Sequence, residues 1–161
     1  MERNVSDVMQ TKVLTVSPDT ALPDLERKLL GSRVGALPVV DRDGRLAGIV
    51  SRSDVVRQLC LERSLGEAMA DVYRDQTDES FAEKAREDVA VAIGKRMEQL
   101  SVRDVMIRDV LTAEPTLSLA KAAQRMIERR VHRLPVVEDG RLVGILTSLD
   151  LVRVVAEASE G

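Results

Sequence analysis

The feature that most constrains this 161-residue chain is an internal duplication. A shift of 97 residues aligns Val5–Met9 with Val102–Met106, and Leu37–Val40 with Leu134–Val137. One residue fewer in the following turn changes the shift to 96, which then aligns Asp54 with Asp150. Matched blocks in the same order indicate a repeated structural unit. Because one copy of about 55 residues would be only marginally stable alone, we expect the two copies to fold together around one core.

Each copy predicts a β-hairpin followed by a helix. Two short apolar runs flank a turn at Asp43-Gly44 in the first copy and at Asp139-Gly140 in the second, and Asp-Gly between apolar runs favours a hairpin. A short strand around Val13–Val16 and an amphipathic helix precede the first hairpin, which gives the order β-α-β-β-α. The helical period of the first copy rests on Leu22, Leu25, Leu29 and Leu30, and the second copy predicts helices over residues 119–130 and 149–158.

Composition excludes several classes of protein. The net charge of −3 argues against general nucleic-acid binding, which depends on clustered Lys and Arg. The only aromatic residues are Tyr73 and Phe81, so platforms for base stacking are missing. No apolar run reaches the length of a membrane span, and no signal-peptide pattern opens the chain, so we expect a cytoplasmic protein. A single His and a single Cys argue against a metal centre, and Cys60 is expected to be a buried small hydrophobe.

The two copies resemble CBS motifs, named after cystathionine β-synthase, arranged in tandem as a Bateman module. The resemblance rests on Val-x-Asp-Val-Met, Leu-Pro-Val-Val and the ending Gly-Ile-x-Ser/Thr-x-x-Asp, each present twice in register. It implies an α/β fold of two β-α-β-β-α units packed through their sheets, with an inserted helical segment between them. The expected organisation is unit 1 over residues 1–61, the helical segment over 62–100 and unit 2 over 101–158.

In the family, clefts between the units often hold AMP, ADP, ATP or S-adenosylmethionine, and the carboxylate of the Ser/Thr-x-x-Asp motif accepts both ribose hydroxyls. The resemblance therefore implies two clefts, each built by both copies. The first cleft would contain Ile49, Ser51, Asp54, Arg103, Val110, Leu111, His132 and Arg133. The second would contain Val13, Leu14, Gly35, Ala36, Ile145, Thr147 and Asp150.

The two implied clefts differ in charge. Val131–Leu134 resembles the phosphate-contacting segment of the gamma subunit of AMP-activated protein kinase, and Arg103 stands where the family often has a phosphate-binding Arg. The first copy has Gly35-Ala36 and Ser6 at the positions that match His132-Arg133 and Arg103. Phosphate is therefore expected in the first cleft, while the second would hold a neutral adenosine or stay empty. For the hydroxyl and Asp residues the alternative is a purely capping role at helix starts.

The segment between the copies carries two apolar stripes, which predict helices that need a partner surface. We expect them to pack at a dimer interface or along the module edge. No paired catalytic carboxylates, Cys–His pair or Gly-rich phosphate loop points to an enzyme. The sequence thus favours a non-catalytic, homodimeric sensor with an adenine nucleotide or S-adenosylmethionine as regulatory ligand. The alternative is a ligand-free structural or dimerisation module whose central helices bind a partner protein. The stripes contain Leu61, Leu65, Met69, Val72 and Tyr73, then Phe81, Ala85, Val89, Ala92, Ile93, Met97 and Leu100.

Overall fold

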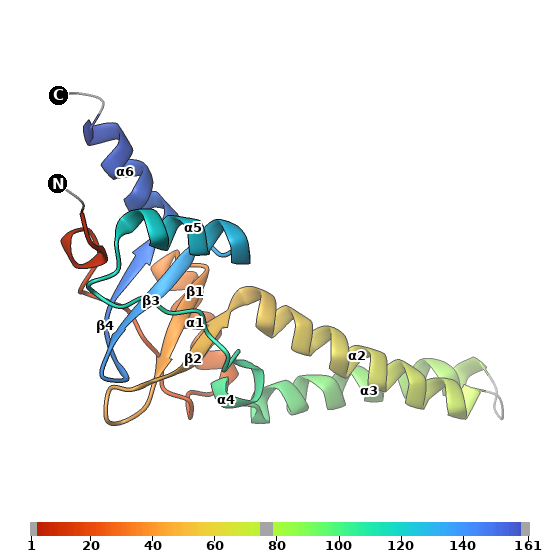
Figure 1. Ribbon diagram of the computed structural model, residues 1–161. Coiled ribbons are helices and arrows are strands. Elements are labelled where there is room, and N and C mark those ends of the chain that lie inside the picture. Colours follow the sequence, from red (N-terminus) through yellow and green to blue (C-terminus); the bar gives the residue numbers. More distant parts are fainter. Residues whose placement is uncertain (1–2, 75–78, 159–161) are drawn as a thin grey trace. The chain divides into compact units, whose positions relative to one another are not determined.

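The computed structural model describes residues 3–74 and 79–158, with the side chains of 70–74, 79–82 and 85 outside the description. The chain is a mixed α/β protein with two two-stranded sheets, β1-β2 and β3-β4, and this confirms the expected fold class (Figure 1). In chain order the elements are η1 (Val5–Asp7), α1 (Leu22–Ser32), β1 (Ala36–Val40), β2 (Leu46–Ser51), α2 (Arg52–Arg74), α3 (Glu79–Gln99), α4 (Val102–Val105), α5 (Leu119–Arg129), β3 (Arg133–Glu138), β4 (Arg141–Thr147) and α6 (Ser148–Ala158).

Both hairpins turn at the Asp-Gly pairs, as predicted. In the second hairpin Asp139 and Gly140 have φ of 51° and 80°, the left-handed values that a two-residue turn requires and that Gly adopts without strain. The strands β3 and β4 are antiparallel, and Arg133 lies opposite Thr147 at the far end of the ladder. In the first hairpin the longer turn is held by Asp41, whose carboxylate accepts from the backbone N–H groups of Asp43 and Arg45 at 2.9 Å.

The first strand expected in each copy is not formed as a strand. In the second copy Ala113 makes a parallel bridge to Val136, and within residues 13–16 of the first copy only Val16 has bridge character. The chain turns directly afterwards, where Leu117 N–H donates to the Glu114 carbonyl across Pro115. Pro at this position fixes the backbone for a turn, so the extended segment ends before a ladder can grow.

The chain divides into two compact units. The segment that begins each copy, here called its entry segment, belongs to the unit that contains most of the other copy. The first unit, here called the C-terminal unit, contains Met1–Thr15, Pro38–Gly48 and Arg108–Gly161, and the central unit contains Val16–Leu37 and Ile49–Ile107. The N-terminal segment therefore belongs with the second copy. Its Val5 N–H donates to the Leu117 carbonyl at 2.8 Å, and in the central unit Val102 N–H donates to the Thr20 carbonyl at 2.8 Å.

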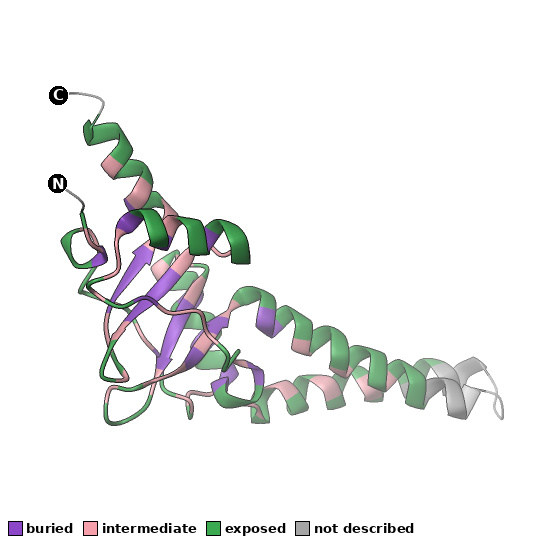
Figure 2. Cartoon of the chain, viewed as in Figure 1, coloured by how far each residue is buried: buried purple, intermediate pink, exposed green. Residues whose placement is uncertain are grey.

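The core of the C-terminal unit is built from α5, the β3-β4 hairpin and η1. Helix α5 buries Leu119, Ala122 and Met126, which recur with the helical period and face the strands. Buried residues also run along the strands (Figure 2). Ser118 caps the helix start, and Arg130 in the left-handed conformation ends it. In the central unit α1 buries Leu22, Leu25 and Leu29, whereas Leu30, expected in that stripe, is 70% exposed.

The predicted central helices form a hairpin of α2 and α3 that packs through an unexpected face. Helix α2 turns Gln58, Glu62 and Gly66 toward the hairpin interior, and a Cβ on Gly66 would lie 2.5 Å from Val89 Cγ1. Glu62 accepts from Gln58 at 2.9 Å and pairs with Arg96 at 3.5 Å. The small residue and this polar pairing allow close approach, so the hairpin interior does not use the apolar stripe of α2.

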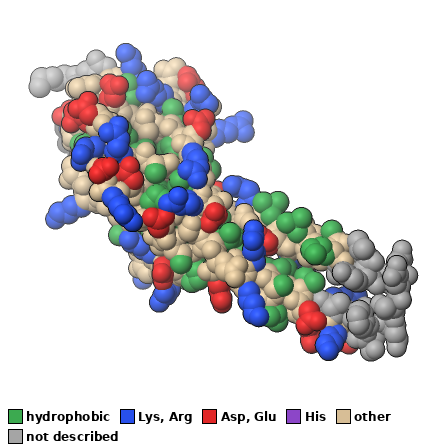
Figure 3. Space-filling view, turned by 90° about the horizontal axis from the view of Figure 1, so that it is seen from below, with side chains coloured by type: hydrophobic (Ala, Val, Ile, Leu, Met, Phe, Trp, Pro, Cys, Tyr) green, Lys and Arg blue, Asp and Glu red, His purple; other side chains and the backbone are tan. Residues whose placement is uncertain are grey.

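The two apolar stripes of the central helices therefore differ in burial. On α3, Val89, Ile93 and Met97 are half-buried, and Val89 and Ile93 pack at Gly66 of α2 within the chain. The stripe of α2 is exposed: Leu61, Leu65 and Met69 are 54%, 62% and 64% exposed. Figure 3 shows apolar side chains at the surface along this hairpin. The side chains of Val72, Tyr73, Phe81 and Ala85 lie outside the described residues.

Cys60 is exposed, so the expectation of a buried small hydrophobe is wrong. The reason is its position on α2, on the opposite side of the helix from Gln58, Glu62 and Gly66. Among the helices of the described residues, none is long and apolar enough to cross a membrane.

Candidate functional site

Each copy ends its hairpin in a hydroxyl residue that caps the next helix together with an Asp. In the first copy Asp54 Oδ2 accepts from the Ser51 backbone N–H at 2.8 Å and from Ser51 Oγ at 2.6 Å. In the second copy Asp150 Oδ2 accepts the same two bonds from Thr147, at 2.8 and 2.6 Å. The hydroxyls accept in return from the Asp N–H groups at 3.3 Å. The capping role is therefore present, and it uses one carboxylate oxygen of each Asp.

Burial separates these two carboxylates from ordinary caps. Asp7 and Asp104 also accept the N–H three residues before them, at 2.7 Å each, yet both are exposed. Asp54 and Asp150 are only 2% and 3% exposed. Removing a carboxylate from water carries a free-energy penalty that a cap does not require. Capping alone therefore does not explain why the carboxylates of Asp54 and Asp150 are buried, because Asp7 and Asp104 cap while exposed.

The second oxygen, Oδ1, differs between the copies. Asp54 Oδ1 is buried and accepts no hydrogen bond within the described part of the chain; Arg57 Nη1 lies 3.0 Å away as an ion-pair partner without hydrogen-bond geometry. Asp150 Oδ1 accepts from Gln10 Nε2 at 3.0 Å, and Arg153 Nη1 lies farther out at 3.8 Å. An acceptor of this kind is suited to hydroxyl or amide donors.

The remaining predicted site residues are distributed over both compact units. In the central unit, Ile49 forms a backbone bridge with Ile107, and the Gly35 carbonyl accepts from the Arg52 N–H at 3.3 Å. In the C-terminal unit, Ile145 exchanges two backbone bonds of 2.9 Å with Gln10. The central unit also carries Ala36 and Arg103, and the C-terminal unit also carries Val13, Leu14, Val110, Leu111, His132 and Arg133.

The three predicted phosphate-binding cations lie in different surroundings. The Arg103 guanidinium pairs with Asp19 and is half-exposed. Arg133 opens β3 directly opposite Thr147, the residue whose hydroxyl caps α6. His132 is exposed, and its carbonyl accepts from the Ser148 N–H at 2.9 Å. Arg133 and His132 thus stand at the end of the hairpin where α6 begins.

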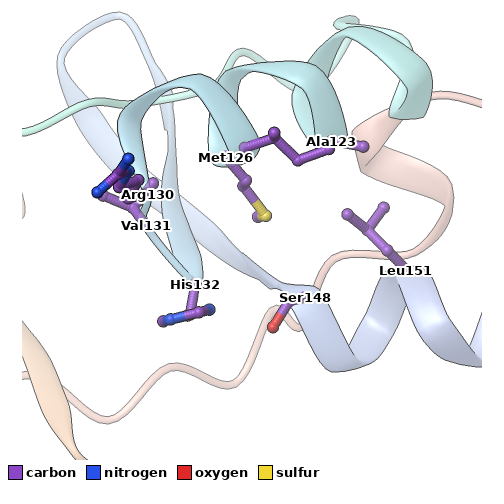
Figure 4. Close-up of a pocket in the computed structure, with 8 residues that line it drawn as sticks. Ala123, Met126, Arg130, Val131, His132, Ser148 and Leu151 are labelled. Carbon is purple, nitrogen blue, oxygen red and sulfur yellow. The ribbon is translucent and has the colours of Figure 1, made fainter.

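A pocket of about 360 Å³ lies between α5 and the start of α6 in the C-terminal unit. The Met126 thioether points into it, and His132 and Ser148 lie at its end near α6 (Figure 4). Its size is at the lower end of small-ligand sites. The other lining residues are Ala123, Ile127, Arg130, Val131 and Leu151.

Sequence reasoning missed Gln10, Ser148 and Arg130. Ser148 and Arg130 line the pocket beside His132 but belong to no motif. Gln10 contacts a residue 140 positions away, so no local pattern reports it. A signal was nevertheless present in the duplication, because the position that matches Gln10 in the second copy is the apolar Ile107.

Comparison with known families assigns both copies. The CBS domain family matches residues 5–60 and 102–157, which together exceed half of the chain. The chain belongs to the CBS domain family. The resemblance read from the repeated motifs is thereby confirmed, and CBS pairs of this kind are in general regulatory rather than catalytic modules.

Among its relatives, an uncharacterized protein of Methanocaldococcus jannaschii is 32% identical over 154 residues, which cover 92% of this chain and 88% of that protein. The chloroplastic CBS domain-containing protein CBSX2 of Arabidopsis thaliana is 33% identical over 143 residues, or 86% of this chain and 56% of that protein. The chain spans still less of some longer relatives, down to 23% of one. It therefore matches only part of the length of those proteins.

Solved structures share the fold. The crystal structure of CBSX2 in complex with AMP superposes with a TM-score of 0.70 at 26% identity, over 97% of this chain and 98% of that one. A CBS domain pair in complex with 5′-methylthioadenosine and S-adenosyl-L-methionine gives a TM-score of 0.66 at 21% identity, over 98% and 99% of the chains. The second likeness establishes the shared fold alone.

Proposed function

We propose that this protein is a non-catalytic regulatory module that binds adenosine-containing ligands through Asp54 and Asp150. The observation that carries the proposal is that both carboxylates are buried and that only Oδ2 of each takes part in helix capping. Asp54 Oδ1 accepts no hydrogen bond among the described residues and could accept one from a ligand hydroxyl, whereas at Asp150 the hydroxyl would have to displace the Gln10 amide from Oδ1. A cis-diol such as ribose suits a carboxylate, because charge-assisted hydrogen bonds contribute about 1.5–3 kcal/mol each.

The AMP complex of CBSX2 supports the choice of ligand class, since that protein is 26% identical and shares the fold over nearly the whole chain. Asp54 is the stronger site in this proposal. Its Oδ1 accepts no hydrogen bond among the described residues, whereas Asp150 Oδ1 already accepts one from Gln10. Phosphate groups would contact His132 and Arg133 at the end of the second hairpin. His132 is exposed there and Arg133 is partly exposed, so both side chains are accessible. Arg103, the third predicted phosphate-binding cation, is paired with Asp19. Regulation then requires that the ligand bind two states with different affinity.

A thermal-shift panel of AMP, ADP, ATP, S-adenosylmethionine and adenosine tests the proposal. A ligand held at 100 times its dissociation constant stabilises by about 2.7 kcal/mol, which corresponds to roughly 5–10 °C for a chain of this size. The Asp54→Ala, Asp150→Ala double variant should lose the ligand-induced shift. Asp7→Ala, which removes a capping carboxylate that is exposed, should retain it. No shift with any adenosine compound, in a folded protein, would refute the proposed function.

A second candidate, a dimerisation module, is favoured by one observation: the exposed stripe Leu61, Leu65 and Met69 on α2. Exposed apolar stripes on a helix commonly serve as interaction surfaces. We propose that a second copy of the chain covers this stripe, so that the ligand-binding module is a homodimer. Sedimentation of the wild-type protein distinguishes a dimer from a monomer directly.

A further inference from the structure

The carboxylates of Asp54 and Asp150 contact different residues, although the two Asp residues hold matching positions in the two copies. Asp54 and Asp150 each follow a capping hydroxyl, and each has an Arg three residues later, Arg57 or Arg153. Ile49 and Ile145 each lie two residues before the capping hydroxyl. Each forms a backbone bridge with the residue that follows an Asp-Val-Met motif. That position holds Ile107 in the central unit and Gln10 in the C-terminal unit.

The Gln10 side chain lies over the carboxylate of Asp150. Its Nε2 is 3.0 Å from Oδ1 and 3.3 Å from Oδ2, so one amide group donates to both oxygens. Oδ2 already accepts the N–H and hydroxyl of Thr147. A carboxylate offers about four acceptor positions, and Gln10 takes from Asp150 the part that capping leaves available. Ile107 has no donor in its side chain, and Asp54 Oδ1 correspondingly accepts no hydrogen bond among the described residues.

The same bonds that a ribose would make to Asp150 are therefore already made by the protein. A ligand hydroxyl cannot share the Oδ1 position with Nε2 without displacing it. Displacement is feasible because Gln10 is exposed as a residue, so its amide can turn to water and regain hydrogen bonds there. Its backbone stays in place through the two 2.9 Å bonds with Ile145. The side chain can thus leave while the segment that carries it remains paired.

We propose that the Gln10 carboxamide is a built-in competitor of the ligand at Asp150, which makes the second copy the weaker adenosine site. The proposal rests on the proposed function, since it assumes that Asp150 accepts ribose hydroxyls. Gln10 is a specificity-determining residue in this view: it sets the order in which the two carboxylates fill as the ligand concentration rises. Ile107 donates nothing to Asp54, whose Oδ1 has the Arg57 ion pair but accepts no hydrogen bond among the described residues, so Asp54 fills at lower ligand concentration, and Gln10 delays occupancy of Asp150.

Calorimetric titration with adenosine tests this in a background that has only one carboxylate. Asp54→Ala leaves Asp150 as the ribose acceptor, and adding Gln10→Ile replaces the competitor with the residue that the other copy carries. We expect affinity at Asp150 to rise about tenfold, the size of effect expected when one charge-assisted hydrogen bond no longer has to be broken. Gln10→Ala should act in the same direction. The reciprocal change, Ile107→Gln in an Asp150→Ala background, should weaken binding at Asp54 by a similar factor.

The contact itself is measured without any ligand. In the wild-type protein the Gln10 side-chain amide resonances should shift when Asp150 is changed to Asn, and should not shift in Asp54→Asn. Unmoved resonances in Asp150→Asn would overturn the proposal. So would an adenosine affinity that Gln10→Ile leaves unchanged or lowers, while the Asp54→Ala background still binds. If no variant and no wild-type protein binds adenosine, the proposed function fails and the competition fails with it, even where the resonances confirm the contact.

Discussion

A single methyl group at Gly66 tests how α2 and α3 pack. A Cβ at this position would lie 2.5 Å from Val89 Cγ1 and 3.3 Å from Ile93 Cδ1. Val is stiff about its first side-chain torsion, so its methyl group cannot simply turn away. Overpacking of this kind costs about 1–3 kcal/mol, while replacing Gly by Ala inside a helix returns about 1 kcal/mol. Gly66→Ala should therefore lower the free energy of unfolding by about 0–2 kcal/mol.

The matched control is Gly94→Ala on α3, where a Cβ meets nothing within 4 Å. Here the helix propensity acts alone, and the variant should be about 0.5–1 kcal/mol more stable. Urea denaturation of both variants gives the difference, expected at about 1–3 kcal/mol, or several degrees in melting temperature. Adding Val89→Ala to Gly66→Ala should remove most of the penalty as a coupling energy. Equal stabilisation by both Gly→Ala changes would refute the packing of Gly66 against Val89.

Three further outcomes are expected. Leu65→Glu should lower the dimer fraction in sedimentation, because it puts a charge into the exposed stripe of α2. Val91→Glu, on the outer side of α3, should leave the dimer fraction unchanged, and equal effects of the two variants would show that α2 is not the dimer surface. Arg133→Ala should reduce the affinity ratio of AMP to adenosine in calorimetry by about tenfold through loss of a phosphate contact, and an unchanged ratio would exclude that role. Gly144→Ala should destabilise by about 1–3 kcal/mol in urea, because its Cβ would lie 2.6 Å from Met9 Sδ and 3.0 Å from the Gln10 carbonyl; full stability would contradict the pairing of the N-terminal segment with β4.

The hairpins and helices of both copies were predictable because their signals are local. Asp-Gly between apolar runs specifies a turn, and Leu119, Ala122 and Met126 mark the buried face of α5 by spacing alone. The pairing of α2 with α3 was not predictable from periodicity. The apolar stripe marks a face that needs covering, but Gly66 and the Gln58–Glu62 pair determine which face approaches the neighbouring helix.

The capping carboxylates were predictable as a motif, since the duplication preserves the same hydroxyl and Asp in both copies. Their burial was not, because it depends on what surrounds Asp54 and Asp150 in three dimensions. The Gln10 contact joins residues 140 positions apart and belongs to no motif. The exchange of entry segments between the compact units explains this, because it brings residues of the first copy to the carboxylate of the second.

The most direct test of the central claim is calorimetry of adenosine against 2′-deoxyadenosine in the Asp150→Ala protein, where Asp54 remains. If the Asp54 carboxylate accepts the ribose hydroxyls, loss of the 2′ hydroxyl removes one charge-assisted hydrogen bond and weakens binding by roughly ten- to a hundredfold. Asp54→Asn in the same background should abolish most of that discrimination. Equal affinity for the two nucleosides, with binding intact, would contradict ribose recognition by Asp54.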